Sequence, residues 1–316
     1  MTYGKKYLEK KYNTSLNELK KFPKYFLIET INTCNARCIM CGIDFDKKRT
    51  QLMTDSLFKK ILDEISENVD YVEKVQIYYD CEPLIDKKLH LKIKDLKNIG
   101  VKTTNIATNA SILFPKRSQE LIEANLDEIY ITIDSMKKEI FELIRLRLNF
   151  DEVLKNTLDF IKIRNKLNSK LNIRLQMISL KENLGEEKYF QDYWKKKLNT
   201  NDDIVIHKAH NWGKVIDDRK LIGDANINDI PCSTLWSNFC IHVNGSVGMC
   251  SVDTIQGSEN SLGNLNNKTI KEIWNDDKVE KMREMHLNGK RSNHKLCDGC
   301  STWRPDMNFS KIKGLN

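Results

Sequence analysis

Residues 25–41 read YFLIETINTCNARCIMC, a short apolar segment followed directly by three closely spaced cysteines. The segment Tyr25–Thr30 predicts a β-strand, because it is a brief apolar run rich in strand-favouring residues. Cys34, Cys38 and Cys41 offer three thiolates from the loop after that strand. Three thiolates leave one iron of a four-iron cluster without a protein ligand, and a small molecule can bind there. The alternative is a zinc site completed by a histidine, but no histidine lies near in the sequence.

Strands and helices alternate in the sequence as far as about residue 210. After Tyr25–Thr30, the predicted strands are Lys74–Tyr79, Lys102–Thr108, Glu128–Ile133, Asn172–Ile178 and Asp203–Ile206. Helices are predicted between them, with Thr54 and Asn149 as N-caps and Pro115 at a helix start. Such alternation predicts an α/β fold whose parallel sheet is covered by helices. An open doubly wound sheet and a curved partial barrel both fit this pattern.

Polar and sulfur-containing residues follow several of the predicted strands. They are Cys34–Cys41, Asp80–Glu82, Thr108–Asn109 and Asp134. In parallel α/β sheets, catalytic and binding residues gather at the carboxyl ends of the strands. We therefore expect these residues to converge on one mouth.

The composition excludes several classes of protein. Of 316 residues, 40% are hydrophobic and 30% charged, which is ordinary for a soluble globular protein. No apolar run approaches the ~20 residues of a membrane span. The net charge of +8 is spread over Lys-rich stretches, so we expect neither nucleic acid nor membrane as a partner. The chain starts without a signal peptide and has nine cysteines, which suits a reducing, cytoplasmic location.

The alternation stops after about residue 210, and Asp217–Asp229 is a polar, aperiodic linker. Two short strands then flank Asn244-Gly245, which favours a tight two-residue hairpin. A helix capped by Thr269 follows. A unit of this size has little core of its own and usually needs a metal or disulfides. Four further cysteines could serve it, as a zinc ribbon or as a second iron–sulfur site: Cys232, Cys250, Cys297 and Cys300.

These motifs, taken in order, resemble the radical S-adenosylmethionine (SAM) superfamily with a C-terminal SPASM/twitch extension. The matching segments are C-x-x-x-C-x-x-C at 34–41, YDCEPL at 79–84, GVKTTNIATN at 100–109, ITID at 131–134, Ile144-Arg145, and the stretch from Pro231 to Cys300. The resemblance implies a partial (βα)6 radical SAM barrel with a small cluster-binding SPASM/twitch domain. It divides the chain into an N-terminal helical extension (1–24), the core (25–210), a linker (211–231) and the SPASM/twitch domain (232–316).

The resemblance also implies a SAM site. Cys34, Cys38 and Cys41 would hold a [4Fe–4S] cluster whose open iron chelates SAM. Reductive cleavage of SAM then gives methionine and a 5′-deoxyadenosyl radical that abstracts a substrate hydrogen. Glu82 would accept a hydrogen bond from the methionine ammonium, and Arg145 would pair with the carboxylate.

The resemblance assigns further residues to the implied SAM site. Thr132 and Asp134 would meet the ribose hydroxyls, and Asn109 belongs to the same site. Three positions depart from the family pattern: Cys81 and Ala110 replace glycines, and Met40 replaces an aromatic residue.

The same resemblance assigns Cys232, Cys250, Cys297 and Cys300 to a second, auxiliary [4Fe–4S] cluster. If protein thiolates occupied all four irons, substrate could not bind to this cluster directly. The expected task of the auxiliary cluster is therefore electron transfer. Two cysteines remain. Cys240 is expected to be a small buried hydrophobic residue. Cys81 lies at the predicted mouth, where its thiol could return a hydrogen atom to a substrate radical.

The leading hypothesis is a radical SAM oxidoreductase that dehydrogenates a sugar-like or aminocyclitol small molecule. An electron donor such as flavodoxin or ferredoxin is expected. Within enzymology the alternatives are an epimerase with Cys81 as the hydrogen donor and a peptide-modifying maturase. The alternative of a different class is a non-catalytic iron–sulfur or zinc protein that acts as a carrier or scaffold.

Overall fold

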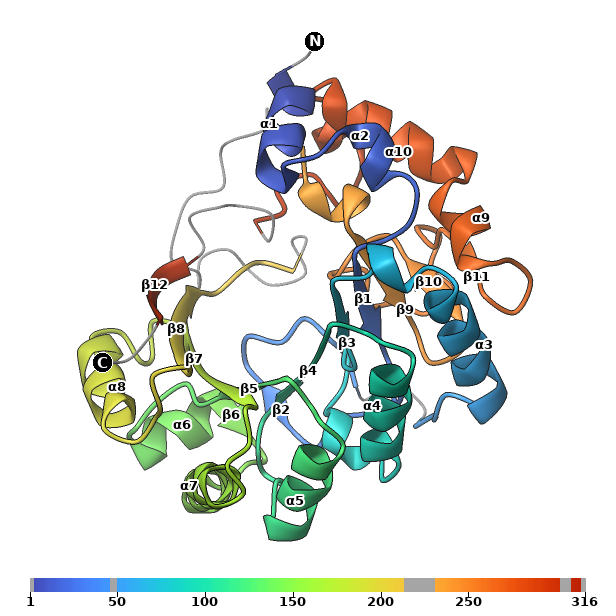
Figure 1. Ribbon diagram of the computed structural model, residues 1–316. Coiled ribbons are helices and arrows are strands. Elements are labelled where there is room, and N and C mark those ends of the chain that lie inside the picture. Colours follow the sequence, from blue (N-terminus) through green and yellow to red (C-terminus); the bar gives the residue numbers. More distant parts are fainter. Residues whose placement is uncertain (1–2, 46–49, 213–230, 302–307, 314–316) are drawn as a thin grey trace.

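The computed structural model describes residues 3–45, 50–212 and 231–301, and the backbone of residues 308–313. One curved sheet runs through it in the order β11-β10-β9-β1-β3-β4-β5-β7-β8-β12 (Figure 1). Its parallel part consists of β1 (Tyr25–Ile28), β3 (Lys74–Gln76), β4 (Thr103–Thr108), β5 (Glu128–Thr132), β7 (Asn172–Ser179) and β8 (Asp203–Lys208). The predicted α/β class and its parallel sheet are confirmed.

The strand order decides between the two folds that the sequence left open. From β1 to β8, each strand of the large sheet lies beside the next one along the chain. A doubly wound sheet reverses its order at a switch point, whereas a barrel keeps the order of the sequence. At the two ends, β1 pairs with β9 and β8 pairs with β12, so the barrel stays open. The fold is therefore a partial barrel.

Helices cover the outer face of this sheet (Figure 1). They are α3 (Asp55–Ser66), α4 (Leu89–Asn98), α5 (Pro115–Glu123), α6 (Lys138–Ile144), α7 (Phe150–Lys166) and α8 (Glu187–Lys195). The predicted N-caps are confirmed, because the side chains of Thr54 and Asn149 accept hydrogen bonds from the amides of Leu57 and Glu152. Helix α6 was not predicted. It is short, and its last residue leads directly into Arg145.

The C-terminal hairpin extends the same sheet. Strand β9 (Asn238–Ile241) lies parallel to β1, and β10 (Ser246–Gly248) and β11 (Gly263–Asn264) follow it. The ring centroids of Phe26 and Phe239 are 5.7 Å apart across the β1–β9 boundary. The hairpin therefore shares the core of the barrel, whereas the sequence suggested a unit with little core of its own that needs a metal or disulfides. The predicted linker lies largely outside the described residues, since 213–230 are not described.

The hairpin turn is wider than the two residues that Asn244-Gly245 suggested. The amide of Gly245 donates to the carbonyl of His242 (2.9 Å), and the amide of His242 donates to the carbonyl of Ser246 (2.9 Å). Gly245 has a φ of +83°, which glycine adopts without strain. This is a three-residue loop closed by a left-handed glycine. It places His242 at the end of β9.

The N-terminal helices pack on the C-terminal ones (Figure 1). These are α1 (Tyr3–Tyr12) and α2 (Leu16–Leu19) against α9 (Ile270–Trp274) and α10 (Asp277–Leu287). The indole of Trp274 donates to the carbonyl of Leu19 (3.2 Å), and both residues are fully buried. The N-terminal helices and the helices α9 and α10 therefore stabilise each other beside β1 and β9.

Candidate active site

A cavity of about 580 Å³ opens at the carboxyl ends of the parallel strands. Residues from β4, β5, β7 and β8 and from the segment after β3 line it together with the loop that carries Cys34, Cys38 and Cys41. The predicted site residues on its wall are Cys34, Cys38, Cys41, Cys81, Glu82, Asn109, Thr132 and Arg145. Of the residues expected to converge on one mouth, the cysteine loop, Cys81, Glu82, Thr108 and Asn109 line the cavity, whereas Asp80 and Asp134 do not.

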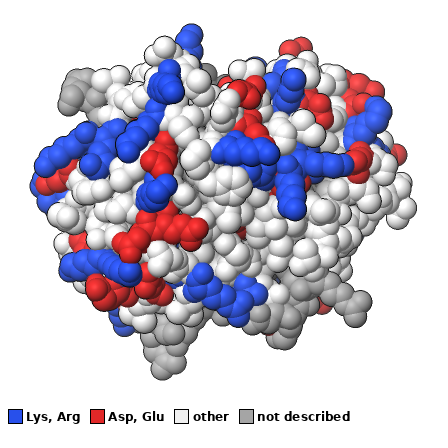
Figure 2. Space-filling view, turned by 90° about the horizontal axis from the view of Figure 1, so that it is seen from below, with Lys and Arg blue, Asp and Glu red and all other residues white. Residues whose placement is uncertain are grey.

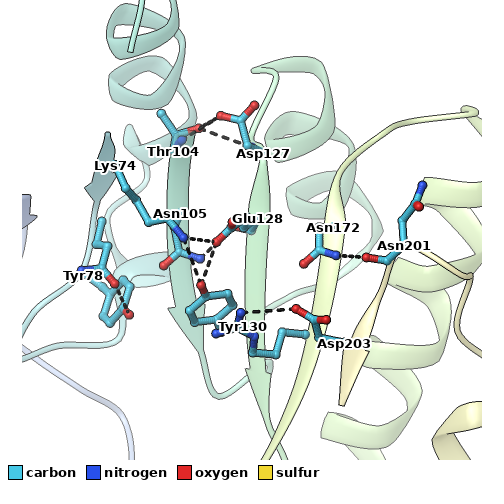
Figure 3. Close-up of polar contacts among 12 residues, drawn as sticks. Lys74, Tyr78, Thr104, Asn105, Asp127, Glu128, Tyr130, Asn172, Asn201 and Asp203 are labelled. Carbon is cyan, nitrogen blue, oxygen red and sulfur yellow. Dashed lines mark hydrogen bonds and ion pairs between the residues drawn. The ribbon is translucent and has the colours of Figure 1, made fainter. Parts of the chain in front are cut away.

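Paired charges fill the barrel beneath the cavity (Figure 3). Lys74 on β3 contacts Glu128 on β5 (2.7 Å), and Arg174 on β7 contacts Asp203 on β8 (3.3 Å). The Arg174 guanidinium also lies 4.0 Å from the centre of the Tyr130 ring. Residues i, i+2 and i+4 of a strand share a face, so Glu128, Arg174 and Asp203 lie on the same face of their strands as the cavity residues Thr132, Gln176 and His207. The network forms a neutral floor for the site.

The cysteine loop is held by main-chain and side-chain bonds from several elements. A two-stranded ladder joins β2 (Arg37–Cys38) to β6 (Arg145–Leu146), with Cys38 opposite Arg145. The side-chain amide of Asn109 donates to Asn35 inside the loop (2.9 Å), and the guanidinium of Arg37 donates to the carbonyl of Cys34 (2.9 Å). The three thiols are therefore oriented by the fold before any ligand binds.

The three thiols of this loop need a cationic partner to ionise. Burial raises the pKa of Cys34 to about 12 and that of Cys41 to about 11, and it also raises the pKa of Cys38. Without a metal centre they would be neutral thiols at pH 7. An iron–sulfur cluster requires thiolates, and its positive irons supply the missing stabilisation. The donor set therefore fits a cluster.

Glu82 presents its carboxylate to the same cavity. Oε1 accepts from the Thr108 hydroxyl (2.7 Å) and the Leu84 amide (3.2 Å), and Oε2 accepts from the Asn109 amide (2.8 Å). Burial raises the pKa of Glu82, and these hydrogen bonds counteract that rise. A carboxylate oxygen offers about two acceptor positions, so Oε2 can accept one more donor from the cavity side.

Replacing Glu82 by Gln is expected to weaken SAM binding by about 10- to 100-fold, because a charge-assisted hydrogen bond contributes about 1.5–3 kcal/mol. Equilibrium dialysis with the reconstituted protein measures this. The matched control is Glu73→Gln, which neutralises a carboxylate that pairs with Lys102 near the surface. Equal SAM affinity of the wild type and Glu82→Gln would remove Glu82 from the SAM site.

Asp134 corrects one expectation. It is fully buried, its Oδ2 accepts from Nε of Arg145 (2.5 Å), and its Oδ1 accepts from the amide of Ile178 (2.7 Å). Both oxygens accept from protein donors and Asp134 does not line the cavity, so the carboxylate positions Arg145. Burial alone lowers the pKa of Arg145, but Asp134 and the Cys38 thiol outweigh it and raise the pKa. The guanidinium is therefore a fixed cation, 3.6 Å from the sulfur of Cys38.

The departures from the family pattern are accommodated locally. Ala110 is buried with a φ of +58°, a conformation that glycine adopts more readily. Met40 lines the cavity, and its carbonyl accepts from the indole of Trp212 (2.9 Å). Burial raises the pKa of Cys81 well above its usual value, so this cavity residue is a neutral thiol.

The far wall of the cavity comes from β7, β8 and the segment after β8. The residues that line the cavity there are Gln176, Ile178, His207, Lys208, Ala209, His210 and Trp212. Trp212 packs so closely on Gly42 that a Cβ there would meet the ring at 2.7 Å. Burial, with His207 nearby, lowers the pKa of His210 to about 4. This wall is aromatic and polar, with neutral His210 at pH 7.

The sequence missed the two tyrosines that precede Asp80. Tyr78 and Tyr79 both line the cavity. The hydroxyl of Tyr79 points to the carbonyls of Cys250 and Asp253, each 2.7 Å away. Their only signal was their place at the end of a strand. Tyr79 connects the cavity wall to the second cysteine set.

The structure brings Cys232, Cys250, Cys297 and Cys300 together away from the cavity wall. Burial raises the pKa of Cys297 to about 12, and the neighbouring thiols of Cys232 and Cys300 contribute. Burial likewise raises the pKa of Cys250 well above its usual value. Cys240 in β9 lies near Cys250 and contributes to its raised pKa, and Cys240 itself is 1% exposed, as expected of a small hydrophobic residue.

The sulfur spacing separates clusters from single ions. Four thiolates on one zinc ion lie about 3.8 Å apart, because each Zn–S bond is about 2.3 Å. Among residues 3–45, 50–212 and 231–301, no three cysteine sulfurs lie within 4.8 Å of one another. A four-iron cluster spreads its ligands over separate irons. Within the described residues, neither cysteine set therefore has three sulfurs at the spacing of ligands around a single zinc ion.

The surface carries no concentrated charge on the face that Figure 2 shows. Lys and Arg side chains there are interspersed with Asp and Glu. Within the described part of the chain, none of the helices has the length and apolar character needed to cross a membrane.

Two protein-family profiles match the segments that form this mouth and the second cysteine set. The profile "Radical SAM superfamily" matches residues 28–175, and an "Iron-sulfur cluster-binding domain" profile, SPASM, matches residues 232–301. The chain belongs to the radical SAM superfamily. Its cofactors are SAM, the [4Fe–4S] cluster of that family and an auxiliary iron–sulfur cluster.

Known proteins of this family are similar over most of the chain. The S-adenosyl-L-methionine-dependent 2-deoxy-scyllo-inosamine dehydrogenase of Niallia circulans is 24% identical over 276 residues, which are 87% of this chain and 91% of that protein. The structure of BtrN in complex with AdoMet and 2-DOIA has a TM-score of 0.61 at 20% identity, over 92% of this chain and 99% of that one. The structure of Streptococcus suis SuiB bound to precursor peptide SuiA has a TM-score of 0.66 at 14% identity, over 86% of this chain and 68% of that one. These two structural likenesses show a shared fold.

Proposed function

We propose that this protein is a radical SAM oxidoreductase that dehydrogenates a carbinol carbon of a sugar-like or aminocyclitol small molecule. The observation that carries the proposal is one cavity with the cysteine loop at one end, a polar and aromatic wall at the other, and a second cysteine set outside it. The dehydrogenase of Niallia circulans, similar along nearly its whole length, acts by its name on 2-deoxy-scyllo-inosamine.

We assign a proposed task to each predicted residue of the SAM site. Cys34, Cys38 and Cys41 hold the cluster, which, with SAM bound, supplies a one-electron cleavage that yields a hydrogen-abstracting radical. Glu82 accepts from the methionine ammonium, and Arg145, fixed by Asp134, faces its carboxylate. Asn109 and Thr132 complete the SAM wall. Trp212, packed over Gly42, helps to keep water from the cysteine loop.

The second cysteine set is proposed to hold the auxiliary cluster and to accept the electron that the substrate must lose. None of its four cysteines lines the cavity, so substrate does not reach it directly. Tyr79 lines the cavity, and its hydroxyl donates a hydrogen bond to the main-chain carbonyl of Cys250. Covalent bonds and this hydrogen bond therefore provide a short route for the electron from the cavity to the second cysteine set. A flavodoxin or ferredoxin is the proposed external reductant for the first cluster.

The proposed domains are an N-terminal extension (1–24), the radical SAM core (25–210), a linker (211–231) and the cluster-binding domain (232–316). The continuous sheet supports treating core and cluster domain as one folding unit with two sites.

The test is anaerobic incubation of the reconstituted protein with SAM, dithionite and 2-deoxy-scyllo-inosamine. We expect 5′-deoxyadenosine to form, together with one new carbonyl group on the substrate for each molecule of 5′-deoxyadenosine. 5′-Deoxyadenosine without a carbonyl product would contradict this substrate while leaving the enzyme class intact. No 5′-deoxyadenosine from protein with verified clusters would favour a carrier or scaffold.

One observation favours epimerisation as a second candidate function. Hydrogen-atom return to a substrate radical needs an S–H group, and Cys81 is a buried, neutral thiol on the cavity wall. In deuterated water, an epimerase would leave deuterium in an inverted product, and Cys81→Ala would abolish the inversion while sparing SAM cleavage. A carbonyl product that Cys81→Ala leaves unchanged would exclude this role.

A further inference from the structure

Three ionisable side chains meet where the C-terminal hairpin joins the barrel. Glu29 follows β1, Asp80 lies just beyond β3, and His242 follows β9. These three strands are neighbours, because β1 pairs in parallel with β3 on one side and with β9 on the other. All three residues are fully buried, and none of them lines the cavity. The trio contains no sulfur and is distinct from both cysteine sets.

The spacing of the trio is that of ligands around one ion. One ligand atom from each residue lies within 4.8 Å of the other two. Nδ1 of His242 is 3.6 Å from Oε2 of Glu29, which exceeds the usual hydrogen-bond distance of about 3.2 Å. Two ligands at about 2.0–2.2 Å from one zinc ion lie about 3–4 Å apart.

The imidazole of His242 is poised for a ligand. Neither of its nitrogens makes a hydrogen bond within the described residues. Buried polar atoms almost always have a partner, and an ion or water often supplies one when protein does not. The ring is fixed in place by stacking on Tyr79, with the two ring centres 4.9 Å apart. Its orientation does not depend on a hydrogen bond.

Charge favours a doubly charged ion. Glu29 and Asp80 bring two carboxylates into a dry interior, and the histidine can bring at most one positive charge. A divalent ion with two carboxylates and a neutral imidazole sums to zero, which lowers the cost of burying them. Mixed imidazole and carboxylate ligands suit first-row ions such as zinc.

We propose that Glu29, Asp80 and His242 bind one buried divalent first-row metal ion, a third inorganic site separate from the two clusters. The ion ties β9 of the C-terminal hairpin to β1 and β3 of the barrel. Through the stacked Tyr79, whose hydroxyl contacts the main chain of Cys250, it also sets the position of the second cysteine set relative to the cavity. The role is structural, so it does not depend on which substrate the enzyme uses.

The test uses zinc as the probe on holoprotein with both clusters reconstituted anaerobically. The protein is incubated with Zn²⁺, passed through a chelating resin and analysed for metals and by zinc-edge X-ray absorption. We expect about one retained zinc per chain with nitrogen and oxygen neighbours at about 2.0–2.2 Å and no sulfur at about 2.3 Å. His242→Gln should lose at least about nine-tenths of that zinc, a tenfold weaker site or more, while iron and sulfide stay unchanged.

The matched control is His90→Gln, which removes a histidine from α4 beside Glu120 and should retain the zinc. Three outcomes would overturn the proposal: no zinc retained by the wild type, a sulfur shell around the zinc, or unchanged zinc in His242→Gln. The wild-type spectrum alone decides the point if His242→Gln fails to fold.

Discussion

Cys34→Ala should abolish reductive cleavage of SAM and lower the iron content by about half, since one of two four-iron clusters loses a ligand. Loss of an outer-shell partner of a metal site already costs about 10- to 100-fold in affinity or activity, and loss of a ligand should cost more. The two remaining thiols, Cys38 and Cys41, have raised pKa values because they are buried, so they do not ionise readily without the irons. The measurement is 5′-deoxyadenosine formed per chain under dithionite.

Cys240→Ala is the control for that experiment. It also removes a buried cysteine, but Cys240 belongs to β9 and lies in neither cysteine set. It should keep the iron of the wild type and cleave SAM at a similar rate. SAM cleavage that survives in Cys34→Ala would remove the cysteine loop from the mechanism.

The second large effect is expected at the other cysteine set. Cys297→Ala should also remove about half of the iron, because full protein ligation of a four-iron cluster takes four thiolates. SAM cleavage should persist, since Cys297 does not line the cavity. Substrate oxidation should fail, because the electron acceptor is lost.

Cys297→Ala should also destabilise the C-terminal part, since metal binding is coupled to folding in small units of this kind. The shared core through Phe239 and Trp274 limits that loss. We therefore expect local opening around residues 291–300, measurable as faster hydrogen exchange there, with β9 still protected. Wild-type iron content in Cys297→Ala would show that Cys297 is not a ligand.

Local signals in the sequence predicted the fold well where short-range chemistry decides it. The strands, the caps at Thr54 and Asn149 and the placement of Glu82 at a strand end follow from periodicity and capping preferences. The pairing of β9 with β1 could not be predicted in this way, because it joins segments that are far apart in the sequence. Periodicity alone could not distinguish the barrel from a doubly wound sheet, but the resemblance to the radical SAM superfamily predicted the barrel, and the strand order confirms it.

The site shows the same division. The cysteines, Glu82 and Arg145 stand in recognisable spacings, so they could be named in advance. Asp134 has an equally recognisable spacing, yet its carboxylate accepts hydrogen bonds from Arg145 and Ile178. The direction of this side chain depends on tertiary packing, so the sequence could not predict it. The trio of Glu29, Asp80 and His242 has no spacing signal at all, since its members come from three strands that meet only in the folded chain.

The most direct measurement is electron paramagnetic resonance of the anaerobically reduced protein, recorded with and without SAM. A four-iron signal whose shape changes when SAM is added is the predicted result, because SAM would occupy the iron that Cys34, Cys38 and Cys41 leave open. A spectrum without a four-iron signal, or one that SAM leaves unchanged, would contradict the account.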